Sequence, residues 1–257
     1  MALINDKSVF DVDTLDNSVI GIAARIGKHD SGMHIHSKAQ LLYAPEGCIS
    51  IQLDDKKSVL PPTRAAWIPA GVRHCATMNN VVEYRSLYFE ETIVASFNEV
   101  KIISVNSLLK ALIERMSFWQ WDKPKQEMHA TLQLFLEELQ SASEYQLTLP
   151  FPNDPRLNHW LDSLQQPDSN VPNLNNLAKQ IGASSKTISR IFSNQAGMPY
   201  QSWRQQWRLL KSIELLSQGK QVNDVAYQLD FSSDSAFITF FKQQTGTTPL
   251  QYMRTTT

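Results

Sequence analysis

Two kinds of hydrophobic pattern divide the chain. Between residues 18 and 89, apolar and β-branched residues form short runs or alternate with polar ones, and glycines and prolines separate these runs. Residues 19–22 and 48–53 are examples, and runs of this kind predict β-strands. We therefore expect an all-β barrel or sandwich in this part of the chain.

From about residue 104 the apolar residues return at helical spacing, and two amphipathic helices are predicted. The second follows Pro124, a residue that suits a helix start. Their apolar positions are Val105, Leu108, Leu109, Leu112, Ile113 and Met116, and then Met128, Leu132, Phe135, Leu136 and Leu139. These stripes pack either on the barrel or on a second subunit, and the extent of the second stripe favours a two-fold dimer.

A proline-rich break at residues 149–155 precedes a region that is predicted to be helical throughout. We place the domain boundary at this break. The predicted organisation is a sensing barrel over residues 1–103, a helical connector and dimerisation segment over 104–148, and an all-α domain over 149–257.

The all-α domain contains an internal repeat of about fifty residues. The first copy has apolar or small residues at 174, 177, 178 and 181, and positions 222, 225, 226 and 229 repeat this spacing. A turn at Gly182 or Asp230 follows, and then a second apolar set at 188, 191 and 192 or at 237, 240 and 241. Each copy predicts a helix-turn-helix unit, over residues 174–192 and 222–241.

A linker helix over residues 199–217 is predicted to join the two units, with Pro199 in its first turn and Gly219 after its end. Its length of about 28 Å is close to the roughly 34 Å between successive major grooves on one face of B-DNA. One chain can therefore present two helices to neighbouring grooves. Arg204, Arg208 and Lys211 form a basic stripe on this helix that either contacts phosphate or is solvated.

These motifs resemble the DNA-binding domain of the AraC/XylS family of bacterial regulators. Residues 184–192 (SSKTISRIF) and 197–199 (GMP) are similar to the first unit of the family, and 229–237 (LDFSSDSAF) and 246–249 (GTTP) to the second. The resemblance implies base contacts from Lys186, Ser189 and Arg190 in the first unit and from Asp234, Ser235, Ile238 and Thr239 in the second. Ser185 is expected to be exposed on the first reading helix.

Two features depart from the family pattern. Asp230 stands where the family usually has glycine, and aspartate tolerates a left-handed backbone better than most residues do. The second reading helix has no arginine or lysine before Lys242. We therefore expect Lys186 and Arg190 to supply most of the direct base readout.

Three histidines of the predicted barrel resemble the histidines of two cupin motifs. His34 and His36 lie on one side of a predicted strand, and His74 follows a sharp turn after Pro69. Gln40 falls where a metal-binding cupin usually has glutamate, and an amide oxygen is a weaker ligand without charge.

The histidine cluster has two interpretations. It is either a site in which His34, His36 and His74 hold a divalent metal ion, or the polar lining of a barrel mouth that binds a small organic effector, and we favour the second. The residues expected to bind such an effector are His34, His36, Gln40, Tyr43, Arg64, Trp67, His74 and Tyr88.

Composition narrows the classes of protein that fit. The 257 residues suffice for two domains, and no apolar run approaches the roughly 20 residues that cross a bilayer. Cys48 and Cys75 are the only cysteines, too few for a disulfide scaffold. The formal net charge of −1 divides into +3 from residue 151 onward and −4 before it, which is compatible with DNA binding by the C-terminal domain.

We therefore expect a cytoplasmic, sequence-specific DNA-binding transcription regulator that is not an enzyme. A small effector, an organic molecule or a metal ion, would bind the cupin-like barrel and change how a homodimer presents its helix-turn-helix units to double-stranded operator or promoter DNA. RNA polymerase is a candidate partner. The alternatives are a cupin-type metalloenzyme with a helical appendage and a protein-interaction scaffold.

Overall fold

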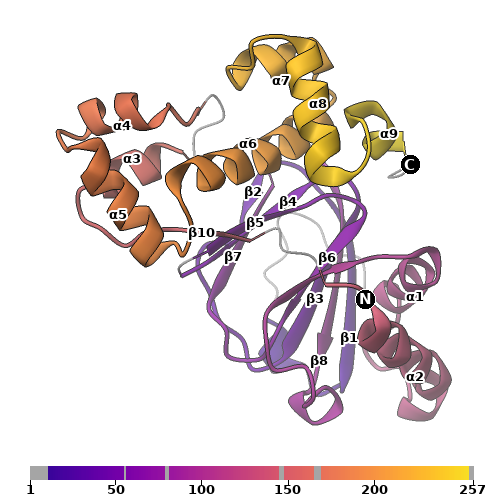
Figure 1. Cartoon of the computed structure of the whole chain (residues 1–257). Coiled ribbons are helices and arrows are strands. Elements are labelled where there is room, and N and C mark those ends of the chain that lie inside the picture. Colours follow the sequence, from indigo (N-terminus) through magenta and orange to yellow (C-terminus); the bar gives the residue numbers. More distant parts are fainter. Residues whose placement is uncertain (1–10, 55, 79–80, 145–147, 165–168, 255–257) are drawn as a thin grey trace. The chain divides into compact units, whose positions relative to one another are not determined.

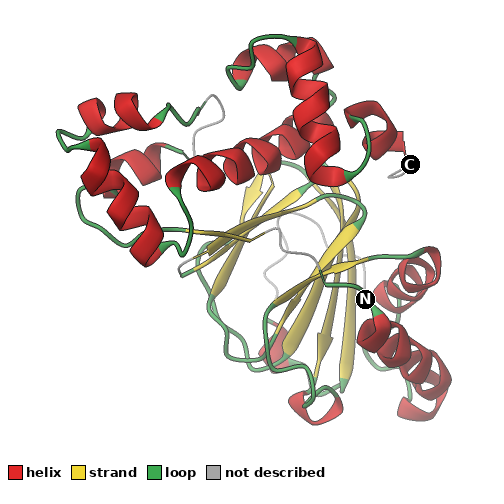
Figure 2. Cartoon of the chain, in the orientation of Figure 1, coloured by secondary structure: helices red, strands yellow, loops and turns green. Residues whose placement is uncertain are grey.

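The computed structural model describes residues 11–54, 56–78, 81–144, 148–164 and 169–254. Figure 2 shows that the strands gather in the N-terminal part of the chain and that the C-terminal part is helical. Backbone contacts divide these residues into two compact units. One holds most of the strands with helices α1 and α2, and the other holds helices α3–α9 with residues 52–59 and strand β10.

The strands form two five-stranded sheets, ordered β1-β8-β3-β6-β9 and β10-β5-β4-β7-β2. Their bounds are β1 (Val19–Ile26), β2 (His29–Asp30), β3 (Ala39–Glu46), β4 (Ile49–Leu53), β5 (Lys56–Leu60), β6 (Arg64–Ile68), β7 (His74–Met78), β8 (Val82–Phe89), β9 (Lys101–Ser104) and β10 (Thr148–Pro150). Short 3-10 helices lie at Val12–Thr14 and Glu91–Ile93. The predicted cupin-like sandwich is confirmed.

Helices α1 (Ser107–Ser117) and α2 (Lys125–Ser141) pack on the first sheet. Alternate residues of β3, β6 and β8, among them Tyr43, Trp67 and Phe89, form one hydrophobic cluster with the helices. The ring of Phe135 stacks on that of Phe89 with centroids 5.3 Å apart. Because Leu132 and Leu136 also pack against this cluster, the α2 stripe is used within the subunit and does not by itself require a second one.

The end of α1 lies unusually close to β1. A Cβ atom at Gly21 would be 2.0 Å from the carbonyl oxygen of Met116, so only glycine fits there. The indole Nε1 of Trp121 donates to the Gly21 carbonyl oxygen at 2.9 Å. These contacts fix α1 and the segment after it on the outside of the sheet.

The segment predicted as a proline-rich break begins with a strand. Strand β10 pairs antiparallel with β5, with Leu149 opposite Lys57 and Pro150 opposite Lys56. Because a residue before proline prefers an extended backbone and proline lacks an N–H, an edge strand accommodates this sequence. The proline-rich break therefore includes a short edge strand, which the sequence pattern did not predict.

The second compact unit contains both helix-turn-helix units, which lie at the two ends of a central helix. Its helices are α3 (Asn158–Ser163), α4 (Leu174–Gln180), α5 (Ser185–Gln195), α6 (Tyr200–Ser217), α7 (Val222–Gln228), α8 (Asp234–Thr245) and α9 (Pro249–Arg254). Figure 1 shows α6 between the α4–α5 pair at one end and the α7–α8 pair at the other. Every helix among the described residues is too short or too polar to span a bilayer.

The sequence repeat is also a repeat of backbone hydrogen bonds. In the first turn Ala183 N donates to Ala178 O at 2.9 Å, and in the second Phe231 N donates to Ala226 O at the same distance. The turn residues, Gly182 and Asp230, have φ of 67° and 54°. The two helix-turn-helix units are therefore built alike, as their sequences predict.

The tryptophans are distributed over the two compact units of the chain. Trp160 and Trp203 lie in an aromatic cluster with Phe192 and Tyr200 under α5, and Trp207 follows on α6. Trp67 and Trp119 belong to the cluster under α1 and α2, and Trp121 packs beside Tyr84 and Tyr88. Five of the six are buried, and Trp121 is half-buried.

Candidate effector cavity and DNA-reading helices

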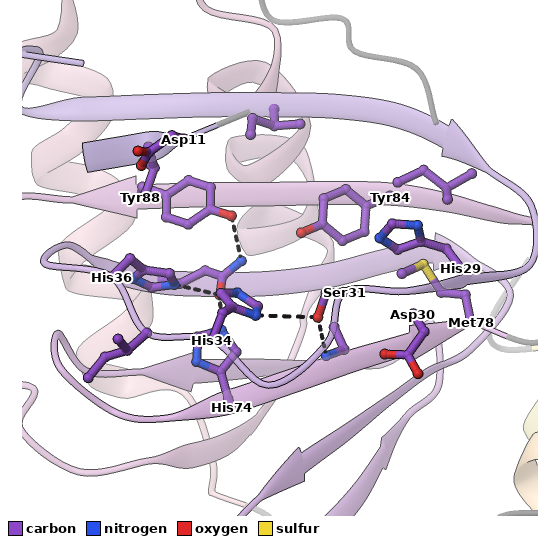
Figure 3. A pocket seen from close by; sticks show the side chains of 16 residues that line it. Asp11, His29, Asp30, Ser31, His34, His36, His74, Met78, Tyr84 and Tyr88 are labelled. Atoms are coloured by element: carbon purple, nitrogen blue, oxygen red, sulfur yellow. Dashed lines mark hydrogen bonds between the residues drawn. The ribbon is translucent and has the colours of Figure 1, made fainter. Parts of the chain in front are cut away.

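A cavity of about 570 Å³ opens into the β-sandwich. One part of its wall is polar and contains the three histidines, Gln40 and Tyr88 (Figure 3). The apolar part of the wall is formed by Val12, Ile22, Ile26, Ala76 and Met78. The volume and the mixture of apolar wall and converging polar groups are typical of a site for a small molecule.

The histidines come together from two segments. His34 and His74 form an isolated backbone bridge, with N–H to O distances of 2.9 and 3.0 Å, and the rings of all three lie within 5.8 Å of one another by centroid. The predicted strand through His34 and His36 is not formed, because residues 31–38 make only this bridge. Side chains tie this segment instead, beginning with Asp30, whose carboxylate accepts from Gly32 N at 2.8 Å.

Each imidazole is oriented by a backbone carbonyl. The Nδ1 atoms of His34, His36 and His74 lie 2.9, 2.6 and 2.9 Å from the carbonyl oxygens of Gly32, Lys38 and Val72. Because a carbonyl oxygen only accepts, each Nδ1 carries a hydrogen, and the lone pair of a neutral ring is on Nε2. The nitrogen ligand atoms of the three rings lie within 4.8 Å of one another.

Gln40 lies at the centre of the cluster. Its Oε1 is 3.3 Å from His36 Nε2 and 3.0 Å from His74 Nε2, and its Nε2 donates to Ser86 Oγ at 2.8 Å and to Tyr88 OH at 2.9 Å. The two ring nitrogens thus present lone pairs to an oxygen that has lone pairs of its own. A cation between these atoms, a second proton on a ring, or a half-turn of the amide satisfies this arrangement.

Two of the three imidazoles, those of His36 and His74, are buried, and burial favours their neutral form. Burial lowers the pKa of His36, and it lowers the pKa of His74 to about 4. Burial also raises the pKa of Tyr84 and of Tyr88 above the ordinary value. Neutral imidazole is the form in which histidine binds a metal ion, so a buried His34/His36/His74 cluster could hold one.

The structure brings together only part of the predicted effector-binding set. His34, His36, Gln40, His74 and Tyr88 line the cavity. Tyr43 and Trp67 do not: they are buried in the cluster under α1 and α2, because their positions in β3 and β6 point to the other face of the sheet. Their polar atoms donate to the carbonyl oxygens of Pro62 and Phe97.

Arg64 also lies outside the cavity lining, and its Nη1 donates to the carbonyl oxygen of Thr63 at 2.8 Å. Tyr43, Trp67 and Arg64, which were expected to bind an effector, therefore lie outside the cavity lining, and the prediction was wrong for them. Tyr84, which lines the cavity, was missed, although Tyr84, Ser86 and Tyr88 alternate along β8 and so share one face of the strand. That period of two was the signal that could have identified it.

Helix α5 presents Lys186 and Arg190 to solvent. Its N-cap residue Ser184 accepts from Thr187 N at 3.1 Å, and its apolar side is buried in the unit at Ile188, Ile191 and Phe192. Lys186 and Arg190 are one helical turn apart, and Ser189 lies beside them, half-buried. Ser185 is half-buried, and its hydroxyl donates to Asn175 Oδ1 at 2.9 Å.

Helix α8 presents a mostly uncharged face. Ser233 caps its N-terminus, and Phe237 and Phe241 are buried beneath it. The exposed residues of this helix include Asp234, Ser235, Thr239 and Lys242, and Ile238 is partly buried. The charged residue in the first turn of α8 is the acidic Asp234, and Lys242 lies in the last turn.

The arginines of the predicted basic stripe on α6 form hydrogen bonds within the protein. Arg204 Nε donates to the carbonyl oxygen of Val171 at 2.8 Å. Arg208 Nη2 donates to the carbonyl oxygen of Leu229 at 2.5 Å, and its guanidinium lies 3.5 Å from the ring centroid of Phe231. Burial lowers the pKa of Arg208 to about 10. Arg208 is neither solvated nor free to bind phosphate, so both predicted roles were wrong for it.

Comparison with known proteins defines the class of this chain. A sequence profile described as the AraC-like ligand binding domain matches residues 17–197, and one described as a helix-turn-helix domain matches residues 177–255. The chain therefore belongs to the AraC family of transcriptional regulators: it is a DNA-binding regulator with a ligand-binding domain and is not an enzyme.

Two of the similar proteins extend along most of the chain, and a third matches its C-terminal part. It is similar to the HTH-type transcriptional regulator NimR of Escherichia coli strain K12, with 28% identity over 224 residues, which are 87% of this chain and 82% of that protein. Among solved structures it is similar to ToxT from Vibrio cholerae, with 12% identity, 92% of this chain and 98% of that chain covered, and a TM-score of 0.36. The C-terminal domain of AraT, a response regulator from Geobacillus stearothermophilus, matches 40% of this chain and 86% of its own, with 23% identity and a TM-score of 0.36.

Proposed function

We propose that this regulator reads an operator with two neighbouring half-sites. Helices α5 and α8 would lie in successive major grooves on one face of the duplex. Lys186, Ser189 and Arg190 would contact bases in the first half-site. In the second, the contacts would come from Asp234, Ser235, Ile238 and Thr239, with Lys242 on the nearby backbone.

The observation that carries this proposal is the pair of matched turns at the two ends of α6. The helix has 18 residues and is about 27 Å long, so with the widths of the two units it approaches the roughly 34 Å groove repeat. The exposed cations of α5 make the first unit the stronger reader, since arginine and lysine form bidentate or charged contacts with guanine.

The test begins with selection of bound fragments from random DNA by the native chain. Lys186→Ala and Arg190→Ala should each weaken binding to the selected operator by about 1 to 3 kcal/mol, roughly five- to 150-fold, and change the preferred base at the position they contact. Arg115→Ala is the matched control, because it removes the same charge from an exposed position on α1. Unchanged affinity in both α5 variants would overturn the contact assignment.

We infer that the effector binds in the cavity of the β-sandwich. The polar wall would orient one end of a small molecule through Gln40, Tyr88 and the imidazoles, and the apolar wall would cover the rest. Binding there would change how the DNA-reading units are presented, which is the coupling that a ligand-binding domain supplies to a regulator.

A divalent metal ion at the same cluster is a second candidate effector. The ligands would be Nε2 of His34, His36 and His74 with Oε1 of Gln40, and these atoms fit an ion because the Nδ1 atoms are already engaged by carbonyl groups. A bound ion would supply a positive centre for an oxygen or nitrogen atom of a further ligand.

We further propose that the protein works as a homodimer in the cytoplasm, where double-stranded DNA and RNA polymerase are its partners. A two-fold dimer would double the number of half-sites that one regulator grips. Sedimentation of the purified chain at micromolar concentration distinguishes a dimer from a monomer, and a strictly monomeric chain on and off DNA would exclude this proposal.

A further inference from the structure

A hydrogen bond joins the segment just before the first helix-turn-helix unit to the turn of the second. Asn170, which lies before α4, donates from Nδ2 to Oδ2 of Asp230 at 2.6 Å, and Asp230 is the turn residue of the second unit. The other side-chain atom of Asn170, Oδ1, accepts from Val171 N at 2.7 Å. The amide of Asn170 is therefore held in one orientation by its own segment while it bonds to the turn of the second unit.

Asp230 is in a conformation that glycine adopts more readily. It is the only residue other than glycine with positive φ in the described part of the chain, and Gly182 occupies the equivalent place in the first turn. A Cβ atom in the left-handed region costs steric energy that glycine avoids. The side chain of Asp230 accepts the hydrogen bond from Asn170, a contact that glycine at this position could not make.

Two arginines of α6 hold the same two segments. Arg204 Nε bonds to the carbonyl oxygen of Val171, next to Asn170, and Arg208 Nη2 bonds to that of Leu229, next to Asp230. The guanidinium of Arg208 also stacks on Phe231, on the other side of the turn residue. Helix α6 thus contacts the segment before α4 and the turn of the second helix-turn-helix unit through side chains four residues apart.

These contacts form a closed loop. Helix α6 packs on α5 through the rings of Trp203 and Phe192, and the bond from Asn170 to Asp230 adds a direct contact between the segment before α4 and the turn of the second helix-turn-helix unit. That contact resists a change in the angle between the two units. We propose that Asn170, Asp230, Arg204 and Arg208 form a spacing latch, which fixes the angle between α5 and α8 and so determines the half-site spacing that one chain accepts. The inference rests on the proposed two-groove reading of the operator.

The spacing latch predicts a specific defect. One base pair added between half-sites turns the second by about 35° around the duplex and moves it along the axis by about 3.4 Å. The native chain should therefore bind the selected operator much better than a version with one base pair inserted or removed. Asp230→Gly suits the backbone but lacks the bond, so it should fold normally and lower this spacing preference by about three- to tenfold.

Three further variants sharpen the test. Asp230→Asn is the matched control, because asparagine tolerates positive φ and keeps an oxygen that can accept from Asn170, so its spacing preference should stay close to native. Asn170→Ala should reproduce the Asp230→Gly defect, and the double variant should show no additional loss. Binding to a fragment with only the first half-site should be equal in all these proteins.

The outcomes separate the latch from simpler roles. A native spacing preference in Asp230→Gly would overturn the inference and leave the proposed function intact. Equal weakening of all fragments, single half-sites included, would show a purely structural role for Asp230 and would also overturn it. If the native chain selects no DNA sequence at all, the proposed two-groove reading fails and the latch fails with it.

Discussion

At the scale of single residues, the amide of Gln40 decides what the histidine cluster can bind. Its Oε1 lies 3.3 and 3.0 Å from the Nε2 atoms of His36 and His74, and its Nε2 donates to Ser86 and Tyr88, so Oε1 occupies the position that a fourth metal ligand would take. A neutral amide leaves the positive charge of a bound ion uncompensated. A carboxylate in its place would compensate part of that charge.

Gln40→Glu should therefore strengthen binding of zinc or nickel by at least about tenfold, or roughly 1.4 kcal/mol, and the ion-free variant should be less stable than the native chain, because a carboxylate is then buried without its cation. Titration calorimetry with each metal salt measures the first effect. Gln126→Glu, at an exposed position on α2, controls for the added charge. Native-like metal affinity in Gln40→Glu would contradict the assignment of Gln40 as a ligand.

The sequence could predict which residues are polar and close in the fold, but not what each one touches. The three histidines and Gln40 were found because their spacing resembles known motifs. The roles of Arg204 and Arg208 could not be found, since arginines four apart on a helix have the same pattern whether they face phosphate or a carbonyl oxygen. Asp230 in place of glycine was the one residue whose departure marked the contact region.

At the scale of elements, the packing of α1 on β1 depends on the absence of a side chain at Gly21. Gly21→Ala would place a methyl group 2.0 Å from the carbonyl oxygen of Met116, and a backbone atom cannot move aside as a flexible side chain can. In this variant the free energy of unfolding of the first compact unit, the β-sandwich with α1 and α2, should fall by about 3 kcal/mol or more, as measured by urea unfolding. Gly27→Ala, where a Cβ meets nothing within 4 Å, should have a small effect; similar losses in both variants would show that α1 tolerates the displacement.

Elements with a strong internal period were predictable, and those determined by long-range pairing were not. Helices α4, α5, α7 and α8 follow from apolar spacing, and the repeat confirms each with a second copy. Strand β10 has only three residues, and its leucine and proline predict an extended backbone and nothing more. Its partner β5 lies about ninety residues away in the sequence, and no local pattern identifies that pairing.

At the scale of the whole molecule, the proposed effector control requires that ligand binding and DNA binding be linked reciprocally. Any ligand that changes operator affinity by a given factor has its own affinity changed by DNA by the same factor. His34→Ala combined with His36→Ala should abolish this linkage for a ligand that acts on the native chain, and should leave operator affinity without ligand within about twofold of native. Operator titrations with and without ligand measure both quantities.

The control for this prediction is His129→Ala combined with His159→Ala, which removes two exposed histidines outside the cavity. That variant should respond to the ligand as the native chain does. A normal response in the His34 and His36 variant would instead place the effector elsewhere in the protein.

The distribution of the indole rings gives the molecule its own optical reporter. Trp121 is the one tryptophan that is not buried, and it packs beside Tyr84, Tyr88 and Ile22, which line the cavity. A collisional quencher dissolved in water therefore reaches mainly this ring. Quenched emission thus reports on the surroundings of Trp121, beside the residues of the cavity wall, and unquenched emission on the five buried rings, without any attached dye.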